Sequence, residues 1–103
     1  IQIERTKICG GGAKSPLWKK MIANILNIKV DVIESEEGPA LGGAMLAAVA
    51  NGEFASVEEA AEKIVKVIDT VEPEPELAAK YEERYQKFAK IYPTVKELFN
   101  EII

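Results

Sequence analysis

The sequence predicts one α/β domain, with a β-α-β-α order followed by carboxy-terminal helices. The first observation is that all seven glycines fall within residues 1–52. The second is that segments with the apolar alternation of a strand and segments with helical periodicity follow one another in this part, whereas residues 53–103 show helical periodicity alone. Because 103 residues support a single core, we treat residues 1–103 as one domain with a glycine-rich part at 1–52 and a helical tail at 53–103.

The first part is predicted to contain two strands joined by a helix. Residues 2–9 run directly into three glycines, as a strand does when it enters a tight turn. A helix is predicted from Pro16, because Ser15 is a favourable N-cap and apolar side chains then recur on one helical face. Residues 28–33 alternate apolar and charged side chains, which predicts the second strand. The helical crossover makes the two strands parallel.

Residues 40–50 predict a second helix, which carries no polar side chain. A helix that is apolar on every side must be covered on every side, and two parallel strands alone leave open sheet edges. The chain also opens on Ile1 rather than on methionine. Together these features predict a piece of a longer polypeptide, and the alternative is an obligate oligomer.

The tail is predicted to form three helices. A capping box of Ser56 and Glu59 opens the first, and its apolar stripe continues to Ile68. Two prolines separate it from a longer helix, which Pro93 is expected to end, and Thr94 then opens a short last helix with a second capping box. The aromatic side chains expected in the core are Trp18, Tyr81, Tyr85 and Phe88.

Composition excludes several kinds of site and partner. One cysteine and no histidine leave no disulfide framework, zinc cluster or histidine-based catalytic triad, and Cys9 is expected to be a buried, inert thiol. A formal charge of −4 argues against nucleic acid as a partner. No apolar run reaches the roughly 18 residues of a membrane span. We therefore expect no membrane or nucleic-acid partner and a cytoplasmic location.

The three glycines at 10–12 lie between a predicted strand and a predicted helix, where backbone N–H groups and the helix dipole can meet an anion. Glycines also let a phosphate or ribose approach the backbone closely. The P-loop motif is excluded because Ala13 precedes Lys14, and the dinucleotide fingerprint is excluded because Ser15 stands at its sixth position. The triplet alone is compatible with an anion site and with a plain tight turn.

A second glycine-containing loop precedes the apolar helix. Glu36 and Glu37 lie at the positive end of that helix, and we interpret Gly42 and Ala44 as positions of close helix packing. Paired carboxylates can serve acid–base or magnesium chemistry. Without a histidine or another charged partner, such a pair is more often simply solvated.

These two segments, at their spacing, resemble the carboxy-terminal domain of the FGGY family of carbohydrate kinases. The motifs that carry the resemblance are Ile8-Cys9-Gly10-Gly11-Gly12-Ala13-Lys14-Ser15-Pro16-Leu17-Trp18 and Glu36-Glu37-Gly38-Pro39-Ala40-Leu41-Gly42-Gly43-Ala44. The tail is similar as well, through Val71-Glu72-Pro73, Tyr81, Tyr85 and Tyr92-Pro93. Within the family the xylulokinase branch is most similar, because glycerol kinases often carry asparagine where Pro16 stands and aspartate where Gly10 stands.

The resemblance implies a sugar kinase of the actin-like, ribonuclease-H-like ATPase fold, in which two domains close over a cleft. It implies that ATP with Mg²⁺ lies mainly on the carboxy-terminal domain and the sugar mainly on the amino-terminal one, where an aspartate is the catalytic base. No catalytic residue and no metal site are then expected in this chain, which should be inactive by itself. The nucleotide-binding residues that the resemblance implies are Gly10, Gly11, Gly12, Ser15, Pro16 and Leu17.

Two interpretations from other classes stay open. One is a non-catalytic, actin-like nucleotide-binding protein, and the other is a small helical oligomerisation module in which the glycines only form a turn. The sugar is open too, since resemblance alone favours D-xylulose, giving xylulose 5-phosphate, over ribulose, gluconate or another polyol. The oligomeric state is undetermined, with a homodimer as one option.

Overall fold

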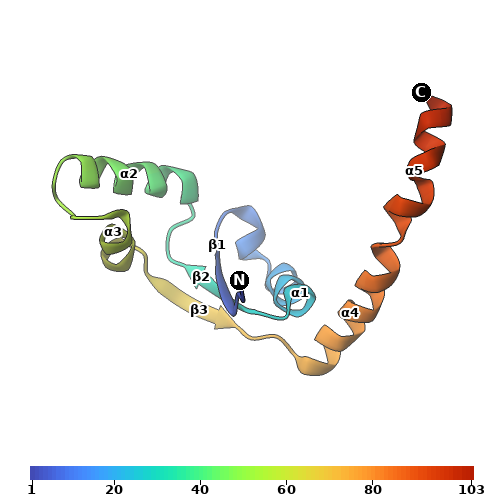
Figure 1. The fold of residues 1–103 in the computed structure, drawn as a ribbon. Helices are drawn as coiled ribbons and strands as arrows, with labels where there is room; N and C mark the ends of the chain where they lie inside the picture. The colour runs from blue at the N-terminus through green and yellow to red at the C-terminus, as the bar shows by residue number, and fades with distance from the viewer.

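The computed structural model describes all 103 residues and has a mixed α/β architecture around one small sheet (Figure 1). This confirms the predicted α/β class and the β-α-β-α order of the first part. The elements in chain order are β1 (Arg5–Ile8), a 3-10 helix η1 (Gly11–Lys14), α1 (Pro16–Leu26), β2 (Lys29–Ile33), α2 (Gly38–Ala50), α3 (Val57–Ile64), β3 (Val67–Val71), α4 (Pro75–Phe88) and α5 (Ile91–Ile102).

The sheet has the order β1-β2-β3, so β2 is the central strand. β1 and β2 are parallel, as predicted, and Ile8 lies opposite Val32. β3 is antiparallel to β2, with Thr70 opposite Asp31. This third strand corrects the sequence analysis, which extended a helix to Ile68. The helix α3 ends earlier because the β-branched run that follows is paired by β2, and pairing of this kind outweighs local periodicity.

One face of the sheet is covered by α1. The side chains of Val30 on β2 and Ala23 on α1 are fully buried there. The helix begins as expected, because the Trp18 backbone N–H donates to Ser15 Oγ at 3.2 Å and Pro16 occupies the first helical position. It ends at Asn27, which adopts a left-handed conformation with φ of 52°.

The opposite face of the sheet carries a polar network across all three strands. Asp31 is only 3% exposed, and its carboxylate accepts a bond from Arg5 Nε at 2.9 Å. The Thr70 hydroxyl donates to the same carboxylate at 2.7 Å. Nearby, the Lys29 ammonium lies 2.9 Å from the Glu72 carboxylate and holds its pKa below the usual value.

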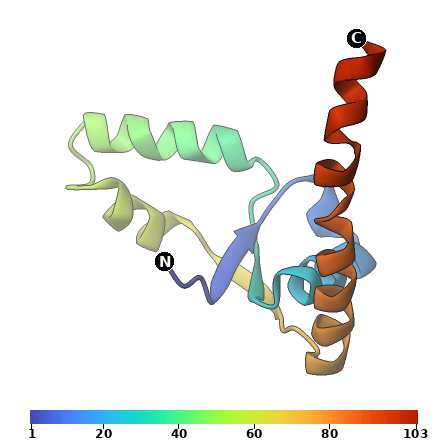
Figure 2. The same cartoon turned by 45° about the vertical axis from the view of Figure 1, so that its right-hand side comes forward.

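The helices α2 and α3 lie together on one side of the sheet, away from the arm formed by α4 and α5 (Figures 1 and 2). The first capping box is confirmed, because the Glu59 N–H donates to Ser56 Oγ at 3.1 Å. The Glu59 carboxylate closes the box on the N–H of Ala55 at 2.8 Å, one residue before the N-cap. No residue of α2 is buried.

The arm differs from the sequence analysis in where its two helices meet. Pro93 lies inside α5 rather than ending α4, and the break falls near Ala89 and Lys90. Proline is accepted there because N–H groups in the first turn of a helix have no intrahelical acceptor. Thr94 therefore caps no helix, and its hydroxyl donates to the Lys90 carbonyl at 2.6 Å.

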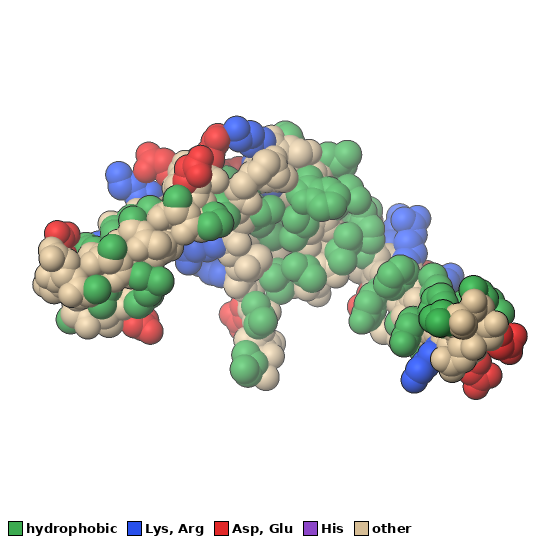
Figure 3. All heavy atoms as spheres, turned by 90° about the horizontal axis from the view of Figure 1, so that it is seen from above, with side chains coloured by type: hydrophobic (Ala, Val, Ile, Leu, Met, Phe, Trp, Pro, Cys, Tyr) green, Lys and Arg blue, Asp and Glu red, His purple; other side chains and the backbone are tan.

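The molecule is extended, with axes of 55 × 39 × 27 Å, and only seven residues are buried. Two expectations were therefore wrong. Trp18, Tyr85 and Phe88 are exposed rather than in a core, and in α4 only Ala78, near the start of the helix, is buried. Cys9 is exposed as well. Figure 3 shows hydrophobic side chains open to view over the centre of the molecule and on the arm.

Candidate functional site

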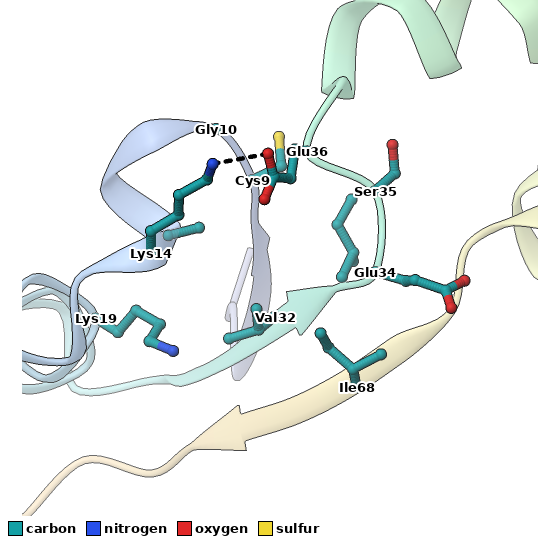
Figure 4. Close-up of a pocket in the computed structure, with 11 residues that line it drawn as sticks. Cys9, Gly10, Lys14, Lys19, Val32, Glu34, Ser35, Glu36 and Ile68 are labelled. Atoms are coloured by element: carbon teal, nitrogen blue, oxygen red, sulfur yellow. Dashed lines mark ion pairs between the residues drawn. The ribbon is translucent and has the colours of Figure 1, made fainter.

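The two loops that the sequence singled out leave the same edge of the sheet. Because β1 and β2 are parallel, the glycine turn after Ile8 and the loop after Ile33 both begin at the carboxyl edge, where open α/β sheets bind ligands. A cavity of about 220 Å³ lies between them (Figure 4). Its walls come from the turn, from residues 32–36 and from single side chains of α1 and β3, which are Lys19 and Ile68.

Two of the three glycines of the turn are explained by the fold, each for a different reason. Gly10 has φ of 85° and ψ of −171°, a conformation that side chains strongly disfavour. A Cβ on Gly12 would lie 2.8 Å from Cδ1 of Trp18, so this glycine makes room for the indole ring. A Cβ on Gly11 would meet nothing within 4 Å. The fold itself therefore explains Gly10 and Gly12 but gives no reason for Gly11.

A further glycine brings the second loop against the turn. A Cβ on Gly38, the first residue of α2, would overlap the Cys9 sulfur. The loop before it is shaped by Ser35, whose Oγ accepts a bond from the Glu37 N–H at 3.2 Å. The start of α2 is thus held close to the end of β1.

The predicted site residues divide into two groups. Gly10 lines the cavity. The other five, which lie on the turn and the start of α1 and are all exposed, do not line it: Gly11, Gly12, Ser15, Pro16 and Leu17. Ser15 is already engaged as the N-cap of α1. These five residues form an exposed surface next to the turn, which is accessible to a ligand lying across the start of α1.

The cavity wall carries four charged side chains, of which only Glu36 was named as a candidate from the sequence. Lys14 Nζ lies 2.8 Å from Glu36 Oε2, and this ion pair joins the turn to the second loop (Figure 4). Lys19 also lines the cavity, and Glu34 forms a longer ion pair with Lys66 at 3.7 Å. Lys14 stands directly after the glycines, which was the signal available in the sequence. The pairing of Lys14 with Glu36 could not be read from the sequence, because it depends on the parallel pairing of β1 and β2.

The structure contains no group of three or more histidine, cysteine or acidic side chains that could hold a metal ion. None of its helices is both long enough and apolar enough to cross a membrane.

The sequence of the chain is similar to those of known proteins. Residues 1–51 match the model of the FGGY family of carbohydrate kinases, C-terminal domain. The chain is 40% identical over 89 residues to xylulose kinase of Bacillus subtilis, covering 86% of this chain and 18% of that protein. It is 36% identical over 98 residues to ribulokinase of Geobacillus thermodenitrificans, covering 89% and 17%.

Solved structures of sugar kinases contain a part with a similar fold. The crystal structure of ligand-bound xylulose kinase from Lactobacillus acidophilus superimposes with a TM-score of 0.83 at 20% identity, over 96% of this chain and 20% of that one. The fold is thus a part of the actin-like ATPase fold of the sugar kinases. The chain spans about a fifth of the length of these relatives. From the matching family model and these relatives, we conclude that the chain belongs to the FGGY family of carbohydrate kinases.

Proposed function

We propose that residues 1–103 are the ATP-binding part of a sugar kinase, within its carboxy-terminal domain. The kinase transfers the γ-phosphate of ATP to a sugar hydroxyl, with D-xylulose as substrate and xylulose 5-phosphate as product. Similarity to both a xylulose kinase and a ribulokinase supports a ketopentose as the substrate class. The proposed partners are ATP, ADP and the sugar, and the proposed compartment is the cytoplasm.

The proposal rests mainly on the empty space beside Gly11. This glycine sits at the carboxyl edge of the parallel strands, its backbone is exposed, and no neighbour in the structure occupies the space of a side chain. Nothing within the fold requires glycine at this position, but a ligand that approaches the backbone closely there would require it. The start of α1 beside it is favourable for an anion. The proposed nucleotide contacts are Gly10, Gly11, Gly12, Ser15, Pro16 and Leu17.

In this proposal the chain positions the nucleotide and performs no proton transfer. Phosphoryl transfer depends on positioning and on charge stabilisation around the nucleotide, which a rigid turn at a helix start can provide. Mg²⁺ arrives on the phosphates of ATP as part of the substrate. The base that accepts the sugar hydroxyl proton belongs to residues outside 1–103, so this chain by itself is expected to phosphorylate no sugar.

The first prediction concerns Gly11→Ala in the protein expressed from its complete reading frame. The new methyl group meets empty space in the structure, so folding is unchanged, but it intrudes where the nucleotide is proposed to lie. We expect the affinity for ADP to fall at least about tenfold, equivalent to about 1.4 kcal/mol of binding free energy. Isothermal titration calorimetry measures the affinity, and the melting temperature reports folding.

Gly43→Ala is the matched control, because a Cβ there also meets nothing within 4 Å and the residue lies away from the turn, in α2. It should leave ADP affinity unchanged. If Gly11→Ala binds ADP as tightly as the parent protein, the proposed contact is wrong. ATP consumption is then measured with D-xylulose, D-ribulose and D-gluconate in turn. Binding of ADP without ATP consumption in the presence of any of the three sugars would instead favour a non-catalytic nucleotide-binding protein.

A further inference from the structure

The ion pair between Lys14 and Glu36 lies at the mouth of the cavity and is the one charged link between the two loops of the site. Lys14 is the last residue of η1, and Glu36 belongs to the loop between β2 and α2. Their charged atoms are 2.8 Å apart. Both side chains are about two-thirds exposed, at 63% and 65%, so neither is held by packing. The pair is therefore free to open.

The charges around the cavity are balanced in this state. Two lysines, Lys14 and Lys19, and two glutamates, Glu34 and Glu36, line it. A phosphate group brought to this edge is attracted by the lysines and repelled by the carboxylates. As long as Glu36 pairs with Lys14, the one cationic side chain of the turn is already neutralised.

We propose that Glu36 and the phosphate groups of the nucleotide compete for Lys14, so that nucleotide binding breaks the Lys14–Glu36 ion pair. This inference rests on the proposed function and deepens it by naming the residue that neutralises the phosphate. Lys14 adjoins the turn at Gly11 and Gly12 on one side and the cavity on the other. Its long stem lets the ammonium group swing from one to the other without movement of the backbone.

The relative strengths of the two interactions favour this exchange. An exposed ion pair contributes little, because water screens it and two flexible side chains must be ordered. A phosphate offers several charged acceptor oxygens, and bonds between ionised groups are about twice as strong as neutral ones. Glu36 therefore keeps Lys14 in place in the free protein but yields to a bound nucleotide.

Calorimetric binding of ADP and of adenosine to the protein from its complete reading frame tests the competition. Lys14→Gln should weaken ADP about tenfold, because a bond between ionised groups is lost, and should leave adenosine unchanged. Glu36→Gln should tighten ADP by about threefold, the size expected for an exposed pair. In the Lys14→Gln background, the effect of Glu36→Gln should fall below about 1.5-fold, since the two residues act through one interaction.

The matched control is the ion pair between Lys87 and Glu83 on α4, which has a separation of 2.7 Å and similar exposure. Lys87→Gln and Glu83→Gln change the net charge in the same way but lie away from the cavity. Both should leave ADP affinity unchanged. If they shift it as the site variants do, net charge explains the effect and the inference is wrong.

The outcomes separate the inference from the function on which it rests. If the parent protein binds neither ADP nor adenosine, the proposed function itself is wrong. If the parent binds ADP and Lys14→Gln binds it equally well, Lys14 does not neutralise the phosphate. If Lys14→Gln weakens adenosine as much as ADP, Lys14 only supports the fold. If Glu36→Gln tightens ADP equally in both backgrounds, Glu36 repels the nucleotide without competing for Lys14.

Discussion

Asp31 is a carboxylate that is buried in a molecule with very few buried residues. An ion removed from water is costly unless each of its acceptors is used. Here the guanidinium of Arg5 approaches both carboxylate oxygens, at 2.9 and 3.3 Å, and Thr70 donates to one of them. Because the three residues lie on three different strands, their bonds align the whole sheet.

Arg5→Leu should therefore lower the free energy of unfolding by about 1–3 kcal/mol, since it leaves a buried charge with a single neutral donor. Denaturant unfolding followed by the fluorescence of Trp18 measures the change. Lys87→Leu removes one partner of an exposed ion pair and should cost less than about 0.5 kcal/mol. Adding Asp31→Leu to Arg5→Leu should restore part of the loss, and a further loss would contradict this account.

The helix ends show how similar sequence motifs lead to different structures. Ser56 and Thr94 both begin a capping-box pattern, and only Ser56 lies at a helix N-terminus. The segment before Ser56 is a turn, so its side chain meets a free N–H group. Thr94 follows a chain that is already helical from Ile91, and its hydroxyl is turned back to a carbonyl instead. A capping motif acts only where the preceding residues leave the helix.

Ser56→Ala is expected to destabilise α3 by about 1 kcal/mol, because the N–H of Glu59 loses its acceptor. Thr94→Ala should change stability by less than about 0.5 kcal/mol, because the higher helix propensity of alanine offsets the loss of the bond to Lys90 on the exposed arm. Hydrogen exchange of residues 57–64 and 91–102 locates each effect. Equal losses of protection in the two helices would show that both motifs act as caps.

At the scale of the whole molecule, too much surface is exposed for a compact domain. The accessible surface is 8071 Å², whereas a compact monomer of 11.3 kDa exposes about 5,700 Å². The radius of gyration is 18.7 Å, compared with about 13 Å for a compact domain of this length. The excess surface includes much of α2, which is apolar on every side and has no buried residue. Exposed apolar surface of this extent marks an interaction face.

The 103-residue chain expressed by itself should consequently bind the dye ANS or self-associate. The driving force is the removal of apolar surface from water, at about 25 cal/mol per Å². Light scattering coupled to size exclusion measures the mass, and small-angle scattering measures the radius of gyration. A monomer with a radius of gyration near 13 Å and no ANS fluorescence would show that the chain closes on itself and that the extended arrangement is wrong.

The sequence by itself determined the local features of this protein. It located α1 with its cap at Ser15, the parallel pair β1 and β2, the glycine turn between them and the first helix of the tail. These features depend on residues a few positions apart, through capping, periodicity and turn chemistry, so a local pattern is sufficient to find them. The turn was found as a candidate site in the same way.

Only the tertiary structure decided what depends on partners distant in the chain. β3 is a strand because β2 pairs with it, and Tyr85 and Phe88 of α4 are exposed because no second layer covers them. The ion pair of Lys14 with Glu36 exists because the parallel register brings two loops to one edge. Such contacts are set by long-range pairing and packing, which no window of neighbouring residues contains.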